Sequence, residues 1–182
     1  MNERYREAER VMREADCLHD AAAVEAALDR MAAAITRDMA GGDVLVLCVM
    51  NGGLVVTGAL LPRLGFPLRV DYIHATRYRE RTSGDLLQWK VEPSQPLAGR
   101  DVLVVDDILD EGYTLEAILA YCAGQQPASL RAAVLVEKRH GRGVRPRVDY
   151  IGLEVPDRYV FGCGMDYKGY WRNAPGIYAV AS

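Results

Sequence analysis

Hydrophobic and polar residues follow one another along this chain in blocks that fit alternating helices and strands. Apolar side chains recur three or four positions apart from Val24 to Met39, which predicts an amphipathic helix. Asp20 stands where an N-cap is expected, and Gly41-Gly42 follows the last apolar position. Val44–Met50 is an unbroken apolar run that is too short for an independent helix. It therefore predicts a buried strand after the first long helix.

The same alternation continues toward the C-terminus. We expect two further helices, at Leu54–Leu64 and at about 114–124, and strands at Leu68–Ile73, 102–106, Ala128–Glu137, Tyr150–Leu153, Tyr159–Phe161 and Gly176–Val180. Strands that alternate with helices form parallel sheets covered on both faces. The predicted fold class is therefore α/β, with a central, mainly parallel sheet flanked by helices.

Three segments stand apart from this alternation. Residues 3–16 are charged and favour a helix, so we expect a helical N-terminal extension over 1–18 that packs loosely or meets another subunit. Residues 77–99 are polar and rich in turn formers, which predicts a flexible loop, either a mobile lid or a functional hairpin. The short strands from about 150 to 182 predict a small C-terminal hood. We expect all of these in one domain, 1–182.

Composition and charge narrow the possible partners. The net charge of −3 and the pI of about 5.7 argue against a general nucleic-acid or anionic-membrane surface. No apolar run approaches the roughly 18 residues that a membrane span needs, and the first residues carry no apolar signal region. The four cysteines are scattered without metal-binding spacing, which favours reduced thiols. We therefore expect a cytoplasmic protein without nucleic-acid or membrane partners.

The densest chemistry follows the run of four apolar residues at 102–105. Asp106 and Asp107 come directly after it, and Asp110, Gly112 and Thr114 lead into the next helix. Open α/β sheets hold ligands outside the carboxyl ends of their strands. Backbone N–H groups around Gly112 suit a phosphate, and paired carboxylates suit Mg²⁺. Because acids would repel a phosphate unless a cation or a sugar lay between them, the pattern indicates a phosphorylated sugar with a metal.

The segment Val102–Leu115 resembles the diphosphosugar-binding motif of the purine phosphoribosyltransferases, specifically the hypoxanthine-guanine phosphoribosyltransferase family. Members join a 6-oxopurine to the ribose of phosphoribosyl diphosphate and release pyrophosphate. The resemblance runs from about residue 20 to 175. It implies a type I phosphoribosyltransferase fold, a Mg²⁺ cofactor, formation of IMP or GMP from hypoxanthine or guanine, and a homodimer or homotetramer.

The resemblance assigns roles within this segment. It implies that Asp106 and Asp107 lie near the ribose hydroxyls and the metal, and that Asp110 is the general base that takes a proton from purine N7. Adenine phosphoribosyltransferases usually have alanine at the position of Asp110, which favours a 6-oxopurine here. The other implied substrate-binding residues of the segment are Ile108, Leu109, Glu111, Gly112, Tyr113 and Thr114, of which Gly112 and Thr114 hold the 5′-phosphate.

The segment Val49–Gly53 resembles the family's pyrophosphate loop, in which a cis peptide turns an amide toward the ligand, and it implies Met50, Asn51 and Gly52 as substrate-binding residues. The corresponding bond is Met50–Asn51. Many members have Lys or Arg where this chain has Asn51, so one cationic contact is missing. The alternative interpretation is an ordinary strand-to-helix turn.

The base-binding residues lie nearer the C-terminus. By resemblance, Lys138 donates to the purine 6-oxygen, Tyr159 stacks on the purine and the Val160 backbone reads its edge. Asp166 corresponds to a metal-ligating acid and Arg172 to a pyrophosphate-binding arginine. The alternatives are a Lys138 that faces water at a strand end and a Tyr159 that is an ordinary core aromatic.

The long loop resembles the family's flexible loop, which closes over the reacting centre and excludes water. Within it, Arg77 or Arg79 offers a cation in place of the one that Asn51 lacks, and Thr82–Asp85 lies near its middle. The ligands implied are phosphoribosyl diphosphate, 6-oxopurine bases, IMP or GMP, and pyrophosphate.

Three other functions remain open from the sequence. One is a xanthine-preferring phosphoribosyltransferase, and another is a nucleotide-sensing, RNA-binding regulator of the same fold. The acidic pI counts against the regulator. The third is a receiver domain of two-component signalling, whose strand-terminal acid pair lies near the N-terminus, whereas most of this chain precedes Asp106.

Overall fold

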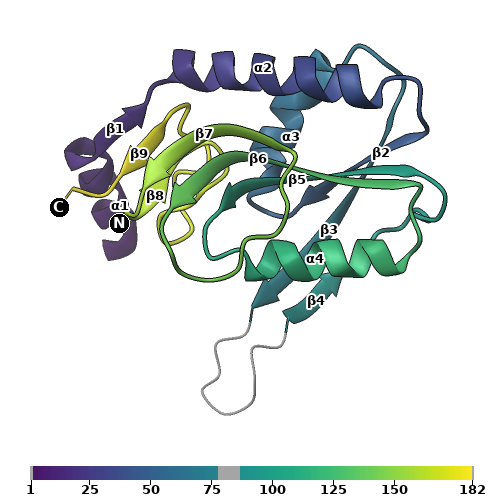
Figure 1. The fold of residues 1–182 in the computed structure, drawn as a ribbon. Helices are drawn as coiled ribbons and strands as arrows, with labels where there is room; N and C mark the ends of the chain where they lie inside the picture. Colours follow the sequence, from purple (N-terminus) through teal and green to yellow (C-terminus); the bar gives the residue numbers. More distant parts are fainter. Residues whose placement is uncertain (1, 78–86, 182) are drawn as a thin grey trace.

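A six-stranded sheet forms the centre of the protein (Figure 1). The computed structural model describes residues 2–77 and 87–181. The strand order is β4-β3-β2-β5-β6-β7, and all neighbours are parallel except β4, which is antiparallel to β3. The bounds are β2 Val44–Val49, β3 Arg69–Arg77, β4 Leu87–Val91, β5 Asp101–Leu109, β6 Ser129–Arg139 and β7 Tyr150–Pro156. This order confirms the predicted α/β class with a mainly parallel sheet.

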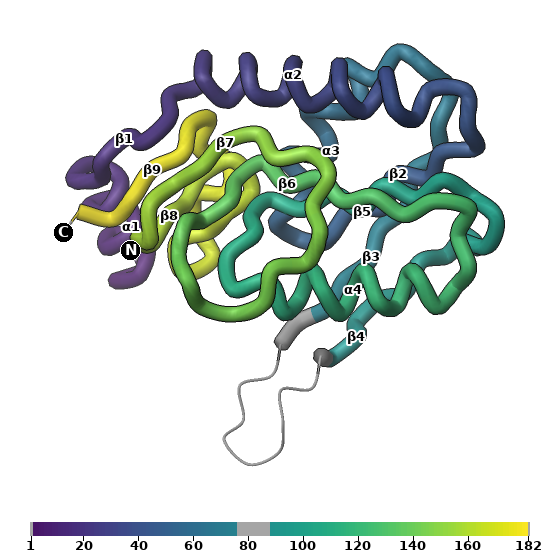
Figure 2. The backbone as a smooth tube through the Cα atoms, in the orientation of Figure 1, coloured from purple at the N-terminus to yellow at the C-terminus, as the bar shows by residue number. Residues whose placement is uncertain are grey.

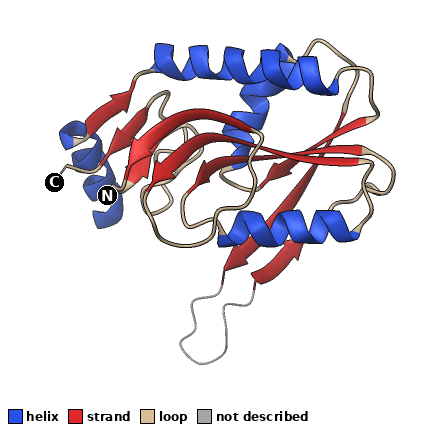
Figure 3. Cartoon of the chain, in the orientation of Figure 1, coloured by secondary structure: helices blue, strands red, loops and turns tan. Residues whose placement is uncertain are grey.

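Helices cover both faces of the sheet (Figure 3). Helices α2 (Ala21–Met39) and α3 (Gly53–Leu60), the latter continued by the 3₁₀ turn η1 (Leu61–Arg63), lie on one face, and α4 (Tyr113–Gly124) lies on the other. The Asp20 side chain accepts a hydrogen bond from the Ala23 N–H at 2.8 Å, so it caps α2 as predicted. Alternate side chains of the buried strands face the two helical layers, which gives two apolar cores.

A second, antiparallel sheet forms the C-terminal hood. It pairs β1 (Asp16–His19), β9 (Ile177–Ala179) and β8 (Val160–Phe161) in the order β1-β9-β8. Figure 2 shows the N-terminal β1 (purple) beside the C-terminal β9 (yellow). The helical extension predicted over 1–18 is present as a helix only up to Glu14, because residues from 16 onward form a strand whose partner is about 160 residues away in the sequence.

Of the two expectations for this segment, loose packing is wrong for helix α1 (Glu3–Glu14), while contact with another subunit stays a prediction. The Ala8 and Val11 side chains of α1 are buried against Phe161 and Tyr167 of the hood. Polar contacts add to this: the Glu7 carboxylate accepts hydrogen bonds from the Tyr167 hydroxyl at 2.8 Å and from the Lys168 ammonium at 2.7 Å. Helix α1 is thus fastened to the hood of its own chain.

The second half of the expected flexible loop is structured. Residues 87–91 are strand β4, and the Trp89 ring packs on Tyr121 of α4 with ring centroids 4.7 Å apart. The buried Asp71 carboxylate accepts hydrogen bonds from the Ser94 hydroxyl at 2.9 Å and the Gln95 N–H at 2.8 Å, which fixes the following turn. The predicted loop residues Tyr78, Arg79 and Thr82–Asp85, and the side chain of Arg77, lie outside the described residues.

The cysteines are free thiols, as expected. Burial raises the pKa of the Cys122 and Cys163 thiols to about 11, so these two remain protonated and unreactive at neutral pH. No helix in residues 2–77 and 87–181 is long and apolar enough to cross a membrane.

Candidate active site

The carboxyl ends of β2 and β5 border a cavity of about 600 Å³. It is open to the segments that follow these strands, where ligands of open α/β sheets bind. Most of the predicted substrate-binding residues line it: Met50, Asn51, Gly52, Asp106, Asp107, Ile108, Asp110, Glu111, Gly112, Tyr113, Thr114 and Arg172.

A smaller cavity of about 280 Å³ lies beside the first, and the two share Asp107, Ile108 and Asp110. Its remaining lining includes the predicted residues Lys138, Tyr159, Val160 and Asp166. The structure therefore gathers the predicted residues into two adjoining compartments with the acidic segment of β5 between them.

Leu109 is the exception among the predicted substrate-binding residues, and its role stays a prediction. Its side chain lines neither cavity and is buried in the core under α4. The reason is that β5 continues in register with β6 as far as the pair Leu109 and Glu137, so side chains still alternate between the two faces there. The sequence placed the strand end at residue 106, where this alternation would have stopped.

Asp106 and Asp107 lie within strand β5, near its carboxyl end, rather than in a solvated turn. Asp107 is buried, and Asp106 lies beside it, with its carboxylate accepting the Asp107 N–H at 2.8 Å. Burial raises the pKa of both carboxyls, and for Asp106 the neighbouring Asp107 charge raises it further. The Arg172 guanidinium, 3.9 Å from Asp107, offsets part of this effect. The acid pair is therefore held in surroundings that disfavour its full ionisation.

The loop after β2 packs directly on this acid pair. A side chain at Gly52 would collide with the Asp107 carboxylate, and one at Gly53 would meet the Val105 carbonyl. The cis peptide between Met50 and Asn51 is present, as the resemblance implied. The two glycines are thus explained by close approach to β5, which brings the backbone of this loop to the rim of the larger cavity.

The segment before α4 is shaped by a left-handed glycine. Gly112 is the N-cap residue of α4 and has a φ of 82°. Being a glycine, it offers no side chain to cap the helix. A side chain here would also collide with the Val144 carbonyl, while the Val144 N–H donates to the Glu111 carbonyl at 2.8 Å. The loop after β6 therefore supports this turn from behind and leaves the amide groups of the helix start on the cavity side.

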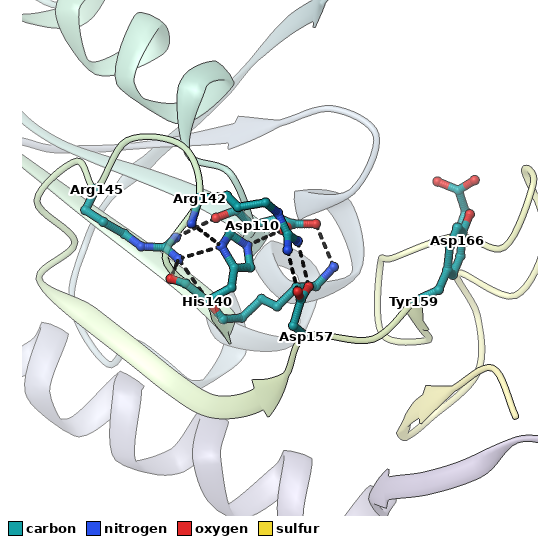
Figure 4. A network of polar contacts seen from close by, with 8 residues as sticks. Asp110, His140, Arg142, Arg145, Asp157, Tyr159 and Asp166 are labelled. Carbon is teal, nitrogen blue, oxygen red and sulfur yellow. Dashed lines mark hydrogen bonds and ion pairs between the residues drawn. The ribbon is translucent and has the colours of Figure 1, made fainter. Parts of the chain in front are cut away.

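Asp110 has quite different surroundings from the acid pair. Its carboxylate accepts a hydrogen bond from the Lys138 ammonium at 2.6 Å. It also accepts one from the His140 ring at 2.7 Å (Figure 4). Partial burial alone would raise the pKa of Asp110, but the hydrogen bonds from Lys138 and His140 outweigh it and hold that pKa below its usual value. Asp110 is thus an ionised carboxylate at neutral pH.

The smaller cavity pairs an exposed aromatic ring with a buried cation. Tyr159 is 53% exposed, and its hydroxyl donates to the Asp166 carbonyl at 3.4 Å. Lys138, which lines the same cavity, is 8% exposed. Both alternative interpretations are therefore wrong, because this tyrosine is not a core aromatic and this lysine does not face water. An open ring and an ammonium donor suit a flat base that carries an acceptor.

Asp166 and Arg172 form an ion pair with each other. Asp166 also accepts the Gly169 N–H at 2.7 Å, and Arg172 donates to the Gly164 carbonyl at 2.5 Å. In the described ranges, no three His, Cys, Asp or Glu side chains come together as a metal site. The predicted set of Asp106, Asp107 and Asp166 is therefore not assembled in this structure.

Sequence reasoning missed several residues of the site. His74 and Lys90, from β3 and β4, and Arg142, from the loop after β6, line the larger cavity. Lys90 and Arg142 therefore supply cations at that cavity. From the sequence, only Arg77 or Arg79 had been suggested to replace the cation that is missing at Asn51. The basic residues that follow Lys138 were the available signal, but without the fold they could not be told from a solvated strand end.

Comparisons with known proteins give one consistent result. A family model described as a phosphoribosyl transferase domain matches residues 14–168. The hypoxanthine-guanine phosphoribosyltransferase of Mus musculus is 31% identical over 155 residues, which cover 80% of this chain and 71% of the mouse protein.

Solved structures agree with this. A hypoxanthine-guanine phosphoribosyltransferase from Bacillus anthracis has a TM-score of 0.83 at 26% identity and covers 91% of this chain and 97% of its own. A structure described as a hypoxanthine-guanine-xanthine phosphoribosyltransferase has a TM-score of 0.83 at 28% identity, with 92% and 97% covered.

Proposed function

Because this chain belongs to the phosphoribosyltransferase family, we propose that it transfers the 5-phosphoribosyl group from phosphoribosyl diphosphate to hypoxanthine or guanine, giving IMP or GMP and pyrophosphate. The observation that carries this proposal is the position of Asp110. Its carboxylate lies where the two cavities meet and is bonded to Lys138 of the smaller one. A base in one cavity and a sugar diphosphate in the other would therefore meet beside a carboxylate that can accept a proton.

The larger cavity suits the sugar diphosphate. The 5′-phosphate fits the amide groups from Glu111 to Thr114 at the start of α4, with the Thr114 hydroxyl as a further donor. The ribose hydroxyls then lie toward Asp106 and Asp107. The departing pyrophosphate faces the Gly52 loop and Arg172, whose planar guanidinium binds two oxygens at once.

The donor set fits Mg²⁺ without a ready-made protein cage. Mg²⁺ retains several waters and takes one or two carboxylates together with substrate phosphate oxygens. Asp106 and Asp107 are such a pair, and a cation beside them would relieve the ionisation penalty that burial imposes on both. Asp166 would join only after releasing Arg172. When bound, Mg²⁺ supplies charge neutralisation for the pyrophosphate leaving group.

In the smaller cavity, Tyr159 stacks on the purine, the Val160 backbone reads its edge and Lys138 donates to the 6-oxygen. An ammonium group favours a carbonyl acceptor and disfavours the amino group of adenine. As the N9–C1′ bond forms and the bond from C1′ to the pyrophosphate oxygen breaks, Asp110 takes the proton from N7. This proton transfer leaves a neutral purine in the nucleotide.

Xanthine is a second candidate base. It carries the same 6-oxygen as hypoxanthine and guanine, and one similar structure is described as accepting it. The bases differ at the 2-position, which lies toward backbone groups beside Val160.

We also infer that the chain forms homo-oligomers. Apolar side chains on α3 and β3 are exposed: Leu54, Val55, Val70 and Tyr72. A largely apolar cavity of about 370 Å³ lies between these two elements and is lined in part by Met50 of the pyrophosphate loop. An apolar face of this kind is typical of an interface between subunits. Light scattering that gave the mass of one chain at micromolar concentration would contradict this inference.

A spectrophotometric panel tests the proposed function. Hypoxanthine, guanine, xanthine and adenine are each supplied with phosphoribosyl diphosphate and Mg²⁺, and nucleotide formation is followed. We expect turnover with one or more 6-oxopurines, loss of turnover on chelation of Mg²⁺, and little turnover with adenine. Absence of product with all three 6-oxopurines, or a preference for adenine, would contradict the proposal.

A further inference from the structure

The structure points to a residue to which the family resemblance assigned no role as part of the acid-base machinery. We propose that His140 is a positioning residue for Asp110, holding one carboxylate oxygen so that the other is aimed at the purine. This inference rests on the proposed function for its chemical meaning. The contact itself is a property of the protein and is measurable without turnover.

The hydrogen bonds around the ring define its tautomer. Nδ1 of His140 receives the Arg142 backbone N–H at 3.1 Å and lies 3.2 Å from the Arg145 guanidinium, and both of these groups can only donate. Nδ1 must therefore be the unprotonated nitrogen. The proton is on Nε2, which lies 2.7 Å from Oδ1 of Asp110 and donates to it. Figure 4 shows the ring between Arg145 and Asp110.

The ring is also fixed in place. The His140 side chain is 4% exposed, whereas that of Asp110 is 41% exposed. The Arg145 guanidinium donates to the backbone carbonyls of Asp110 at 2.5 Å, of His140 at 2.7 Å and of Lys138 at 3.3 Å. The Arg145 guanidinium therefore holds the backbones of Lys138, Asp110 and His140 together, which fixes the distances between the three residues.

The two donors on Asp110 play different parts. Lys138 lines the smaller cavity, and its ammonium, which holds Oδ2, is the group that the purine 6-oxygen would attract. When the base binds, Lys138 turns to it and Oδ2 becomes available to accept the N7 proton. His140 lines neither cavity, so it retains Oδ1 throughout. The carboxylate then keeps its orientation when its other partner leaves.

A purely structural role is the rival explanation, since a buried imidazole also fills space. The positioning role and the space-filling role predict different effects of His140 replacement on the titration of Asp110. His140→Met leaves the other charged residues around Asp110 unchanged: Lys138, Arg142, Arg145, Glu111, Asp157, and Asp107, which lines the same cavity. A change in the titration of Asp110 therefore reports the hydrogen bond, whereas a space-filling role would change only the fraction of folded protein.

The kinetic test uses two replacements and a double-mutant cycle. His140→Met removes both ring nitrogens, and His140→Gln retains an N–H donor at similar reach. We expect His140→Met to lower kcat with hypoxanthine by about tenfold while the KM for phosphoribosyl diphosphate changes by less than about twofold, and His140→Gln to recover most of the loss. In an Asp110→Asn background, His140→Met should change kcat by less than about twofold.

His19→Met is the matched control. His19 bonds to the Glu154 carbonyl at 2.9 Å and lies in β1, outside both cavities, so its replacement should leave kcat unchanged. The proposal is overturned if His140→Met lowers kcat equally in the Asp110→Asn background, or if His140→Gln, shown to be folded, is no more active than His140→Met.

An NMR measurement separates this inference from the proposed function. Nitrogen-15 spectra of the wild-type protein should show His140 protonated at Nε2 only. Carbon-13 titration of the Asp110 carboxyl, assigned with Asp110→Asn, should give a higher pKa in His140→Met than in wild type. If no purine is turned over but both signals behave in this way, the function fails and the His140 contact stands. An unchanged Asp110 pKa, or a proton on Nδ1, overturns the contact whatever the activity.

Discussion

Two parts of one short acidic segment have opposite electrostatics. Asp106 and Asp107 are placed where burial raises their pKa, and Asp106 is raised further by its neighbour's charge. Asp110 is only four residues from Asp106, yet donors from β6 and the loop after it lower its pKa. Aspartates of one segment therefore have surroundings that suit two different roles. The pair is left in need of a cation, while the protein itself supplies the partners that keep Asp110 ionised.

This difference follows from which strands each carboxylate meets. The acid pair lies inside the β5 ladder, with the Asp107 carboxylate against the loop at Gly52, whereas Asp110 lies just past the strand end. There it meets Lys138 at the end of β6 and His140 immediately after it. The acid pair needs a cation that binds with the ligand, whereas residues of the protein itself balance the charge of Asp110.

Replacement of Asp110 should have the largest effect on turnover. Asp110→Asn retains the shape but removes the proton acceptor, so turnover with hypoxanthine should fall by roughly tenfold or more while nucleotide binding remains. Steady-state kinetics and calorimetry of IMP binding check the two parts. Near-normal turnover would remove Asp110 from the role of base.

Lys138→Met tests how the smaller cavity recognises the purine. It removes the donor to the 6-oxygen, so kcat/KM with hypoxanthine should fall by about tenfold, as expected for loss of one hydrogen bond to a charged group. The small activity with adenine should not fall in parallel. The measurement is the ratio of kcat/KM values for the two bases. An equal loss with both would mean that Lys138 does not read the 6-position.

Asp106→Asn tests the acid pair by stability. The folded-state pKa of Asp106 is raised, so its contribution to stability is present below the unfolded pKa near 4 and is lost as pH rises through the folded pKa. At pH 7 the variant should therefore melt higher by about 2–4 °C, corresponding to roughly 1 kcal/mol, and the gain should shrink toward pH 4. It should also reduce activity, and a lower melting temperature at pH 7 would contradict this account.

Asp110 should show the opposite and smaller pH dependence. Its folded-state pKa is lowered, so the stability it contributes is present above the unfolded pKa near 4 and is lost as pH falls through the lower folded value. Wild type should thus lose part of its stability in acid that Asp110→Asn does not lose. Urea unfolding at several pH values below about 5 measures this difference. Parallel curves for the two proteins would show that the Lys138 and His140 bonds do not stabilise the carboxylate.

The sequence predicted the regular elements and the β5 motif because both are local. Apolar spacing locates α2, and the unbroken run Val44–Met50 locates β2, with bounds within a residue or two. Asp110 and Lys138, although 28 residues apart, were predicted through the family resemblance. Their direct contact was not, because it depends on the exact register of β5 against β6.

What the sequence could not supply comes from distant partners. Strand β1 exists because Asp16–His19 pairs with β9 at the other end of the chain, and its four residues carry no strand pattern of their own. His140 and Arg145 gain their roles only when the loop after β6 folds back on Asp110. In the sequence, these residues belong to a basic segment of the kind that usually faces water.

A crystal structure with IMP and Mg²⁺ would show whether the nucleotide occupies both cavities as proposed. We expect the phosphoryl group on the amides of residues 111–114, the purine on Tyr159 with its 6-oxygen beside Lys138, and N7 within hydrogen-bond reach of Asp110. A phosphoryl group bound away from the turn that starts α4, or a purine whose N7 faces away from Asp110, would contradict this proposal.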